Sequence, residues 1–167
     1  SNKYLFGIKA LSNGGKISLM LNPLLSIDKI RNNKKNLKIL CIGPRDEAEI
    51  FNIISKGFKL KNITSIDLFS YSPLITVGDM HSLNYDDDYF DIVISGWCLA
   101  YSDNKSLAAK EIMRVTKKSG FIAISASYTK KTNEEIVQNR GYLIGSKDRI
   151  KTSKDIKKLF EKNIYHI

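Results

Sequence analysis

Glycines and polar residues that could bind a ligand stand directly after four short apolar runs of the chain. The runs cover residues 37–42, 62–68, 74–77 and 91–95, and the residues that close or follow them are Gly43-Pro44-Arg45-Asp46-Glu47, Asp67, Gly78-Asp79-Met80-His81 and Gly96-Trp97-Cys98. Carboxylates accept hydrogen bonds from hydroxyl and amino groups, and glycines let a backbone approach a ligand closely. If the runs are parallel strands, all four groups lie at one edge of a sheet, where open α/β sheets bind ligands.

The first of these turns favours a ligand that carries positive charge. A dinucleotide fingerprint needs three glycines, but here only Gly43 is present, with Arg45 and Ala48 at the other two positions. Three acids open the helix that follows: Asp46, Glu47 and Glu49. They suit the helix dipole and would repel a pyrophosphate, whereas Arg45 is able to pair with a carboxylate. S-adenosylmethionine, which has a sulfonium, an ammonium and one carboxylate, fits this turn; the alternative is that the acids only cap the helix.

The elements that must position these residues alternate between apolar runs and amphipathic stretches. Helical spacing is present over residues 46–57 and 105–115, a fifth apolar run covers 121–125, and shorter helices are predicted at 24–31 and 153–162. Strands that alternate with helices indicate a parallel sheet with crossover connections. We therefore predict an α/β fold, namely a Rossmann-like, doubly wound, mostly parallel sheet with helices on both faces.

Between residues 37 and 127 the order of motifs resembles the class I S-adenosylmethionine-dependent methyltransferases. The segments that carry the resemblance are Leu40-Cys41-Ile42-Gly43, Ile66-Asp67, Gly78-Asp79-Met80-His81-Ser82-Leu83-Asn84-Tyr85, Tyr89-Phe90-Asp91-Ile92-Val93-Ile94-Ser95 and the stretch 111–124. The resemblance divides the chain into an N-terminal preamble or cap, residues 1–36, and a methyltransferase-like domain, residues 37–167. Sheets of this family usually finish with two further strands, and the sequence predicts a sheet that lacks the last one.

The resemblance implies a role for each residue that matches a motif. Asp67 would accept hydrogen bonds from both ribose hydroxyls of the cofactor, and Leu68 would pack on the face of its adenine. Asp79 would accept from the adenine amino group, and the backbone N–H of Met80 would donate to the ring.

The remaining expected contacts are with the methionyl portion of the cofactor. Gly43 and Gly96 would allow the backbone to approach the methionyl portion closely. Pro44 and Arg45, which follow Gly43, form a Gly-Pro-Arg variant of the first motif and would also contact the cofactor. Trp97 would line the methionyl pocket or serve ordinary packing. Family members usually carry an acid where Cys41 stands, so that Glu47 would have to supply the carboxylate for the ammonium group. This departure motivates a rival hypothesis, a catalytically silent cofactor-binding or scaffold protein.

The residues after the fourth run bear on the identity of the methyl acceptor. The tetrapeptide of amino-directed DNA methyltransferases is absent there, which favours a small-molecule or saccharide hydroxyl as the acceptor. A hydroxyl acceptor benefits from a general base, and the candidates are His81 and Tyr101, followed by Asp103 and Tyr128. Segments outside the core, residues 128–150 and the preamble, are expected to grip the acceptor.

Composition bounds the remaining choices. The 167 residues carry a net charge of +10 from 27 basic and 17 acidic side chains, and 22 of the basic ones are lysines scattered along the chain. This charge keeps an RNA methyltransferase open as a third hypothesis, whereas a solvated surface explains it more simply.

Only two cysteines occur, no apolar run is long enough to span a bilayer, and no signal peptide is seen, so we expect a cytoplasmic protein with no metal site. A second copy could close an open edge of the sheet, which makes a homodimer a further hypothesis.

Overall fold

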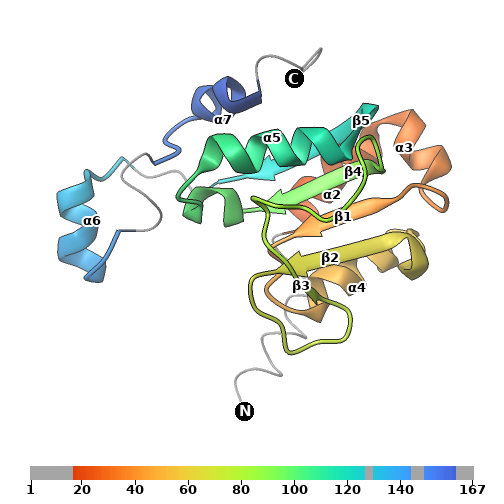
Figure 1. Ribbon diagram of the computed structural model, residues 1–167, viewed down its shortest axis with the longest axis horizontal. Coiled ribbons are helices and arrows are strands. Elements are labelled where there is room, and N and C mark those ends of the chain that lie inside the picture. Colours follow the sequence, from red (N-terminus) through yellow and green to blue (C-terminus); the bar gives the residue numbers. More distant parts are fainter. Residues whose placement is uncertain (1–16, 127–129, 144–148, 161–167) are drawn as a thin grey trace.

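The computed structural model describes residues 17–126, 130–143 and 149–160, and its centre is a five-stranded sheet (Figure 1). The strands are β1 (Ile39–Ile42), β2 (Ile63–Asp67), β3 (Thr76–Val77), β4 (Phe90–Gly96) and β5 (Thr116–Ser125), in the order β3-β2-β1-β4-β5. Every pairing between these strands is parallel. The predicted Rossmann-like sheet is therefore confirmed, and within the described residues it is an open sheet.

The central strand explains why both faces of the sheet must be covered. All four residues of β1 are buried, and successive side chains point to opposite faces. Leu40 and Ile42 belong to one hydrophobic cluster, whereas Ile39 and Cys41 belong to a second one on the other face. A strand that is apolar on both sides is stable only between two layers of helices.

Helices cover both faces, as predicted. The first cluster takes its helical side chains from α5 (Lys105–Val115) and α7 (Ser153–Phe160), and the second from α2 (Ser18–Ser26), α3 (Asp28–Asn33) and α4 (Glu47–Ser55). Two short 3-10 helices, η1 (Leu60–Asn62) and η2 (Cys98–Tyr101), precede β2 and follow β4. The strand arrows in Figure 1 point toward the side on which α6 (Asn133–Arg140) stands away from the sheet.

Local caps fix where the helices begin. Asp46 accepts a hydrogen bond from the N–H of Ala48 at 3.1 Å, and Asn104 accepts one from Leu107 at 3.0 Å, so α4 and α5 start directly after the loops that follow β1 and η2. No helix among the described residues is long and apolar enough to cross a membrane.

Several boundaries differ from the sequence prediction. The single helix expected over 24–31 is wrong: it is interrupted at Ile27, whose backbone is extended (φ −81°, ψ 119°). The hydroxyl of Ser26 donates to the carbonyl of Pro23 at 2.6 Å and takes over a helical acceptor, which ends α2 there. β5 begins five residues earlier than predicted, at Thr116, and α6 forms in a segment for which no helix was predicted. Residues 161–162, the end of the helix predicted at 153–162, lie outside the described residues.

Candidate functional site

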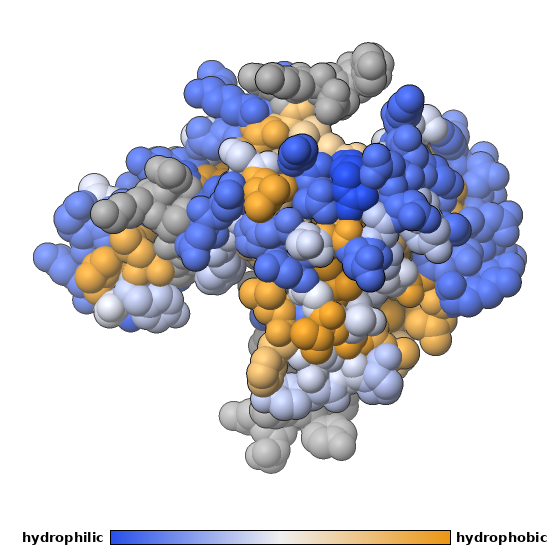
Figure 2. Space-filling view, viewed as in Figure 1, coloured by the Kyte–Doolittle hydropathy of each residue, from blue (hydrophilic) through white to orange (hydrophobic). Residues whose placement is uncertain are grey.

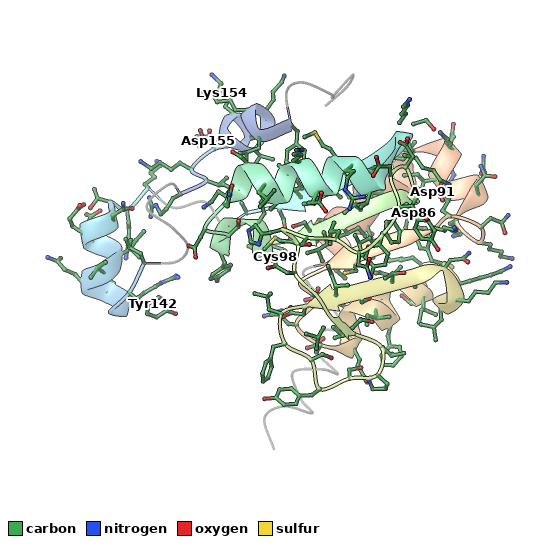
Figure 3. The ribbon with its side chains drawn as sticks, viewed as in Figure 1. Asp86, Asp91, Cys98, Tyr142, Lys154 and Asp155 are labelled. Carbon is green, nitrogen blue, oxygen red and sulfur yellow. The ribbon has the colours of Figure 1, made fainter. Side chains whose placement is uncertain are left out.

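The groups that follow the strands meet at one edge of the sheet. The N–H of Gly43, directly after β1, donates to the carbonyl of Ile66 in β2 at 2.8 Å, and the N–H of Gly78, directly after β3, donates to the carbonyl of Asp67 at 2.9 Å. Figure 3 shows Cys98 at the same edge, beyond the end of β4. The parallel topology therefore brings together residues that are widely separated in the sequence.

Gly43 is required by two features of this turn. Its φ of +73° is a conformation that side chains disfavour, and a Cβ placed on it would lie 2.6 Å from the Cβ of Cys98 and 3.9 Å from Oδ2 of Asp67. The thiol of Cys98 lies close against the turn, since its Sγ donates to the carbonyl of Ile42 at 3.2 Å. Burial raises the pKa of this thiol, so Cys98 is a neutral packing group. No pattern in the sequence indicates this contact.

The acids of the first turn have separate partners. Glu47 accepts a hydrogen bond from the hydroxyl of Ser72 at 2.5 Å, which ties α4 to the loop between β2 and β3. Glu49 lies 3.5 Å from Nε of Arg45, and its side chain is only 16% exposed. Burial raises the pKa of Glu49, and the guanidinium of Arg45 opposes that rise. A positively charged ligand group near the first turn of α4 would likewise offset the cost of burying the ionised Glu49.

The end of β2 presents a carboxylate beside an apolar surface. Oδ1 of Asp67 accepts from the N–H of Phe69 at 3.1 Å, which fixes the carboxylate at the strand end. The side chains nearby are unusually exposed for apolar residues, with Leu68 at 67% and Phe69 at 65%. Figure 2 shows hydrophobic surface over this β2–β3 side of the molecule. A carboxylate next to exposed apolar groups suits a ligand with hydroxyls on one part and an aromatic ring on another.

The segment after β3 is held in a tight turn. Oδ1 of Asp79 accepts from the N–H of His81 at 2.9 Å and lies 2.6 Å from Nδ1 of the same histidine. Nε2 of His81 lies 2.7 Å from Oγ of Ser102, at the end of η2. The side chain of Met80 is buried in the core between these two polar residues. Both ring nitrogens of His81, a candidate general base, are therefore already hydrogen-bonded within the protein.

The turn after β4 combines close packing with an unusual backbone. A Cβ on Gly96 would lie 3.1 Å from the terminal methyl of Met20, so α2 packs directly beneath the turn. Trp97 has a φ of +64°, which a bulky side chain rarely adopts and which is common at binding sites. Its ring packs against the second hydrophobic cluster, whereas Tyr101 is 58% exposed. Trp97 therefore contributes packing, and Tyr101 presents its hydroxyl to solvent.

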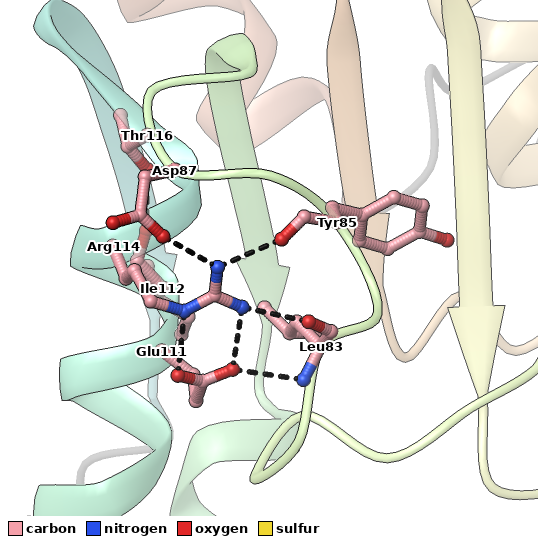
Figure 4. Close-up of polar contacts among 7 residues, drawn as sticks. All are labelled: Leu83, Tyr85, Asp87, Glu111, Ile112, Arg114 and Thr116. Atoms are coloured by element: carbon pink, nitrogen blue, oxygen red, sulfur yellow. Dashed lines mark hydrogen bonds and ion pairs between the residues drawn. The ribbon is translucent and has the colours of Figure 1, made fainter.

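A single arginine fastens the loop between β3 and β4 to α5 (Figure 4), and we call its set of contacts the Arg114 clamp. Arg114 donates to both carboxylate oxygens of Glu111 and to Asp87 at 2.8 Å, and to the carbonyls of Leu83 and Tyr85 at 2.7 Å. Glu111 in turn accepts from the N–H of Leu83 at 2.9 Å. The loop that begins with Asp79 is thus anchored at its other end. The sequence signal is a Glu and an Arg spaced i,i+3 on a predicted helix, which indicates that the two are neighbours but not that they hold a loop.

Other polar residues lie away from this edge. Figure 3 shows Asp86 and Asp91 far from Cys98, and Asp91 pairs with Lys117 at 2.7 Å, a structural contact. Tyr142 lies beside α6 and is 62% exposed. Tyr128 lies outside the described residues, and among the described ones no three His, Cys, Asp or Glu are grouped as a metal site.

Comparisons with known proteins agree with this arrangement. Residues 55–124 match a family described as a methyltransferase domain, a range that contains Asp67, Asp79 and Gly96. A search of curated proteins finds no match.

Three solved structures illustrate the shared fold. A candidate methyltransferase of Bacillus halodurans is 16% identical, with 81% of this chain and 66% of that one covered and a TM-score of 0.59. The YcgJ protein of Bacillus subtilis is 15% identical, with 89% and 67% covered and a TM-score of 0.62. The methyltransferase CalH, in complex with S-adenosylhomocysteine, is 14% identical, with 86% and 48% covered and a TM-score of 0.62.

The chain spans about two thirds or less of the length of these structures. At such identities the likeness shows the fold, and the domain match adds that residues 55–124 are similar to a methyltransferase domain. The match of residues 55–124 to a methyltransferase domain and the fold shared with these structures make the chain similar to the class I S-adenosylmethionine-dependent methyltransferases.

Proposed function

We propose that this protein transfers a methyl group from S-adenosylmethionine to a small-molecule or saccharide-type acceptor. The observation that carries the proposal is the juxtaposition of Gly43 with Asp67 at the strand edge, because a hydrogen-bond acceptor for hydroxyls there adjoins a close backbone turn. The exposed side chain of Leu68 lies next in the chain, where an adenine would pack. Asp79, in the loop fastened by Arg114, would accept from the adenine amino group.

The residues of the first turn fit the charged end of the cofactor. Arg45 carries a guanidinium that would pair with the carboxylate, in the Gly-Pro-Arg variant of the first motif. Glu49 lies one helical turn from it and is partly buried, so it is better placed than Glu47, which is bonded to Ser72, to face an ammonium group. Gly96 and Trp97 would border the methionyl portion from the side of β4.

Bound S-adenosylmethionine would supply a methyl group activated by its sulfonium. The chain's own contribution would be to hold the acceptor in line with that methyl group, since positioning accounts for much of the barrier lowering in such displacements. His81 has no free ring nitrogen, which leaves the exposed side chains of Tyr101 and Asp103 as the described candidates to hold the acceptor proton. The two free thiols, Cys41 and Cys98, fit a reducing compartment such as the cytoplasm.

The proposal is tested by calorimetric titration of S-adenosylmethionine and S-adenosylhomocysteine, with NAD as the control ligand. We expect micromolar binding of both, reduced at least tenfold in Asp67→Asn and unchanged in Asp86→Asn, a matched acid far from the site (Figure 3). Absence of binding at millimolar ligand would refute the proposal and favour a scaffold protein with a methyltransferase fold.

The nature of the acceptor has its own test. If RNA were the acceptor, its binding would weaken steeply between low and moderate salt, because lysines on the surface would release counterions from the phosphates. We expect no such binding, since the 22 lysines are scattered along the chain, as on a solvated surface. Tight, salt-dependent RNA binding would replace the small-molecule acceptor with RNA.

A further inference from the structure

Three side chains from two loops form a continuous hydrogen-bonded chain at the rim of the site. Oδ1 of Asp79 lies 2.6 Å from Nδ1 of His81, and Nε2 of the same ring lies 2.7 Å from Oγ of Ser102. His81 and Ser102 are 21 residues apart in the sequence and belong to the segments after β3 and after β4. The histidine therefore bridges two loops that the sheet places side by side.

One arrangement of the protons in this chain uses the hydroxyl proton of Ser102 as well as both ring nitrogens of His81. The N–H of His81 donates to the carboxylate of Asp79, and this bond is the main reason that the pKa of Asp79 lies below its ordinary value. An ionised carboxylate only accepts, so Nδ1 of His81 must carry a proton. Oγ of Ser102 accepts from the N–H of Asn104 at 3.1 Å, which leaves its own proton able to donate to Nε2 at 2.7 Å. In this arrangement the second ring nitrogen, Nε2, is an acceptor.

Ser102 is the fixed end of the chain. It is 3% exposed, its N–H donates to the carbonyl of Leu99 at 3.3 Å, and its carbonyl accepts from Nζ of Lys105 at 2.8 Å. These contacts anchor it between η2 and the first turn of α5. Asp79, at the other end of the chain, has a half-exposed side chain and is the one that a ligand can reach.

We infer that Ser102 is a positioning residue, which holds His81 with Nδ1 as the donor to Asp79 and Nε2 as the acceptor from Ser102, and through it fixes the carboxylate of Asp79 at the rim of the site. His81 is then a link between the two loops and is not available as the general base of the reaction. The inference rests on the proposed function only where it concerns the cofactor, which Asp79 would meet through the oxygen not bonded to His81.

The first test is the tautomer of His81 in the unmodified protein, read from long-range ¹H–¹⁵N NMR correlations of the ring at neutral pH. The chain has only two histidines, His81 and His166, so His81→Gln assigns the signals. We expect a protonated Nδ1 and an unprotonated Nε2. A protonated Nε2, or a ring that averages between both tautomers, would overturn the inference, and this measurement needs neither cofactor binding nor turnover.

The second test compares Ser102→Ala with Ser106→Ala, an exposed serine one turn away in α5. In Ser102→Ala the ¹⁵N signal of Nε2 should shift and the affinity for S-adenosylhomocysteine should fall about fivefold, the effect of one lost neutral hydrogen bond. Ser106→Ala should change neither. An Nε2 signal that stays in place in folded Ser102→Ala would refute the positioning role. If the parent protein binds no S-adenosylhomocysteine, the proposed function fails, while the NMR results still decide whether Ser102 orients His81.

Discussion

The Arg114 clamp should be among the most sensitive polar features of the protein. Replacement of Arg114 by methionine keeps an unbranched side chain in α5 but removes every donor of the guanidinium. The carbonyls of Leu83 and Tyr85 and the largely buried carboxylate of Glu111 then lose the guanidinium, and Glu111 keeps only the N–H of Leu83 among the bonds of the described residues. The pKa of Glu111 lies below its ordinary value mainly because of this hydrogen bond, so the pairing stabilises the folded state.

The magnitude follows from the exposure of each partner. Hydrogen bonds to a charged group contribute about 1.5–3 kcal/mol each, and the loss of one partner of a poorly exposed pair costs about 3–5 kcal/mol. Arg114 is 29% exposed and Glu111 15%, so we expect Arg114→Met to lower the free energy of unfolding by about 3 kcal/mol. The bond to Asp87 adds little, since that side chain is 74% exposed, and Asp87→Asn should cost less than about 1 kcal/mol.

Urea denaturation followed by circular dichroism measures the free energy of unfolding of both variants, and thermal denaturation measures their Tm. For a chain of this size 1 kcal/mol corresponds to about 2–4 °C, so Arg114→Met should lower Tm by about 6–12 °C. Equal losses in Arg114→Met and Asp87→Asn would refute the reasoning, because they would mean that only the exposed ion pair matters.

Three further outcomes are expected. Gly43→Ala should lower the free energy of unfolding by at least twice the roughly 1–2 kcal/mol expected for Gly141→Ala. Both glycines have a positive φ, but of the two only Gly43 also has a neighbour within 4 Å of the added Cβ. Equal losses of the two variants in urea denaturation would contradict the packing argument. The folded-state pKa of Glu111 is lowered, so its stabilisation is complete above its ordinary pKa of about 4.5 and is lost as pH falls toward the folded value. Glu111→Gln should therefore flatten the loss of stability between about pH 5 and pH 3, which is measured by denaturation at each pH. Burial raises the pKa of the thiols of both Cys41 and Cys98, so mass spectrometry should find neither alkylated by iodoacetamide at pH 8 in the native protein and both alkylated in urea.

The layers and the order of elements were predictable from the sequence because they follow from local patterns. The run of residues 39–42 is apolar at every position, which only a strand covered on both faces allows, and α5 was predicted at its observed bounds because its apolar residues recur at helical spacing. Asp46 and Asn104 mark helix starts through their own side chains, so those boundaries too could be found locally.

The site was less predictable because its details depend on contacts between distant segments. Nothing in the sequence indicates that Cys98 fills the space above Gly43 or that Ser102 meets His81, since each pair is joined only by the parallel register of β1, β4 and the loops beyond them. The same is true of Glu47, which was expected to face the cofactor and is bonded to Ser72. The chemical types at the strand ends were predicted, whereas their partners required the fold.

The place of β1 in the middle of the sheet has a consequence for how the chain reaches its native state. The N–H of Lys38, just before β1, bonds to Asp91 across 53 residues, and β1 cannot pair with β4 until that whole stretch has been synthesised. Sequence-distant pairing of this kind raises the contact order and slows folding. During synthesis the apolar faces of β1 would stay uncovered while the ribosome adds these residues, at about 5–20 residues per second in general. We therefore expect folding yield to depend more on chaperones and temperature than the stability of the finished protein would suggest.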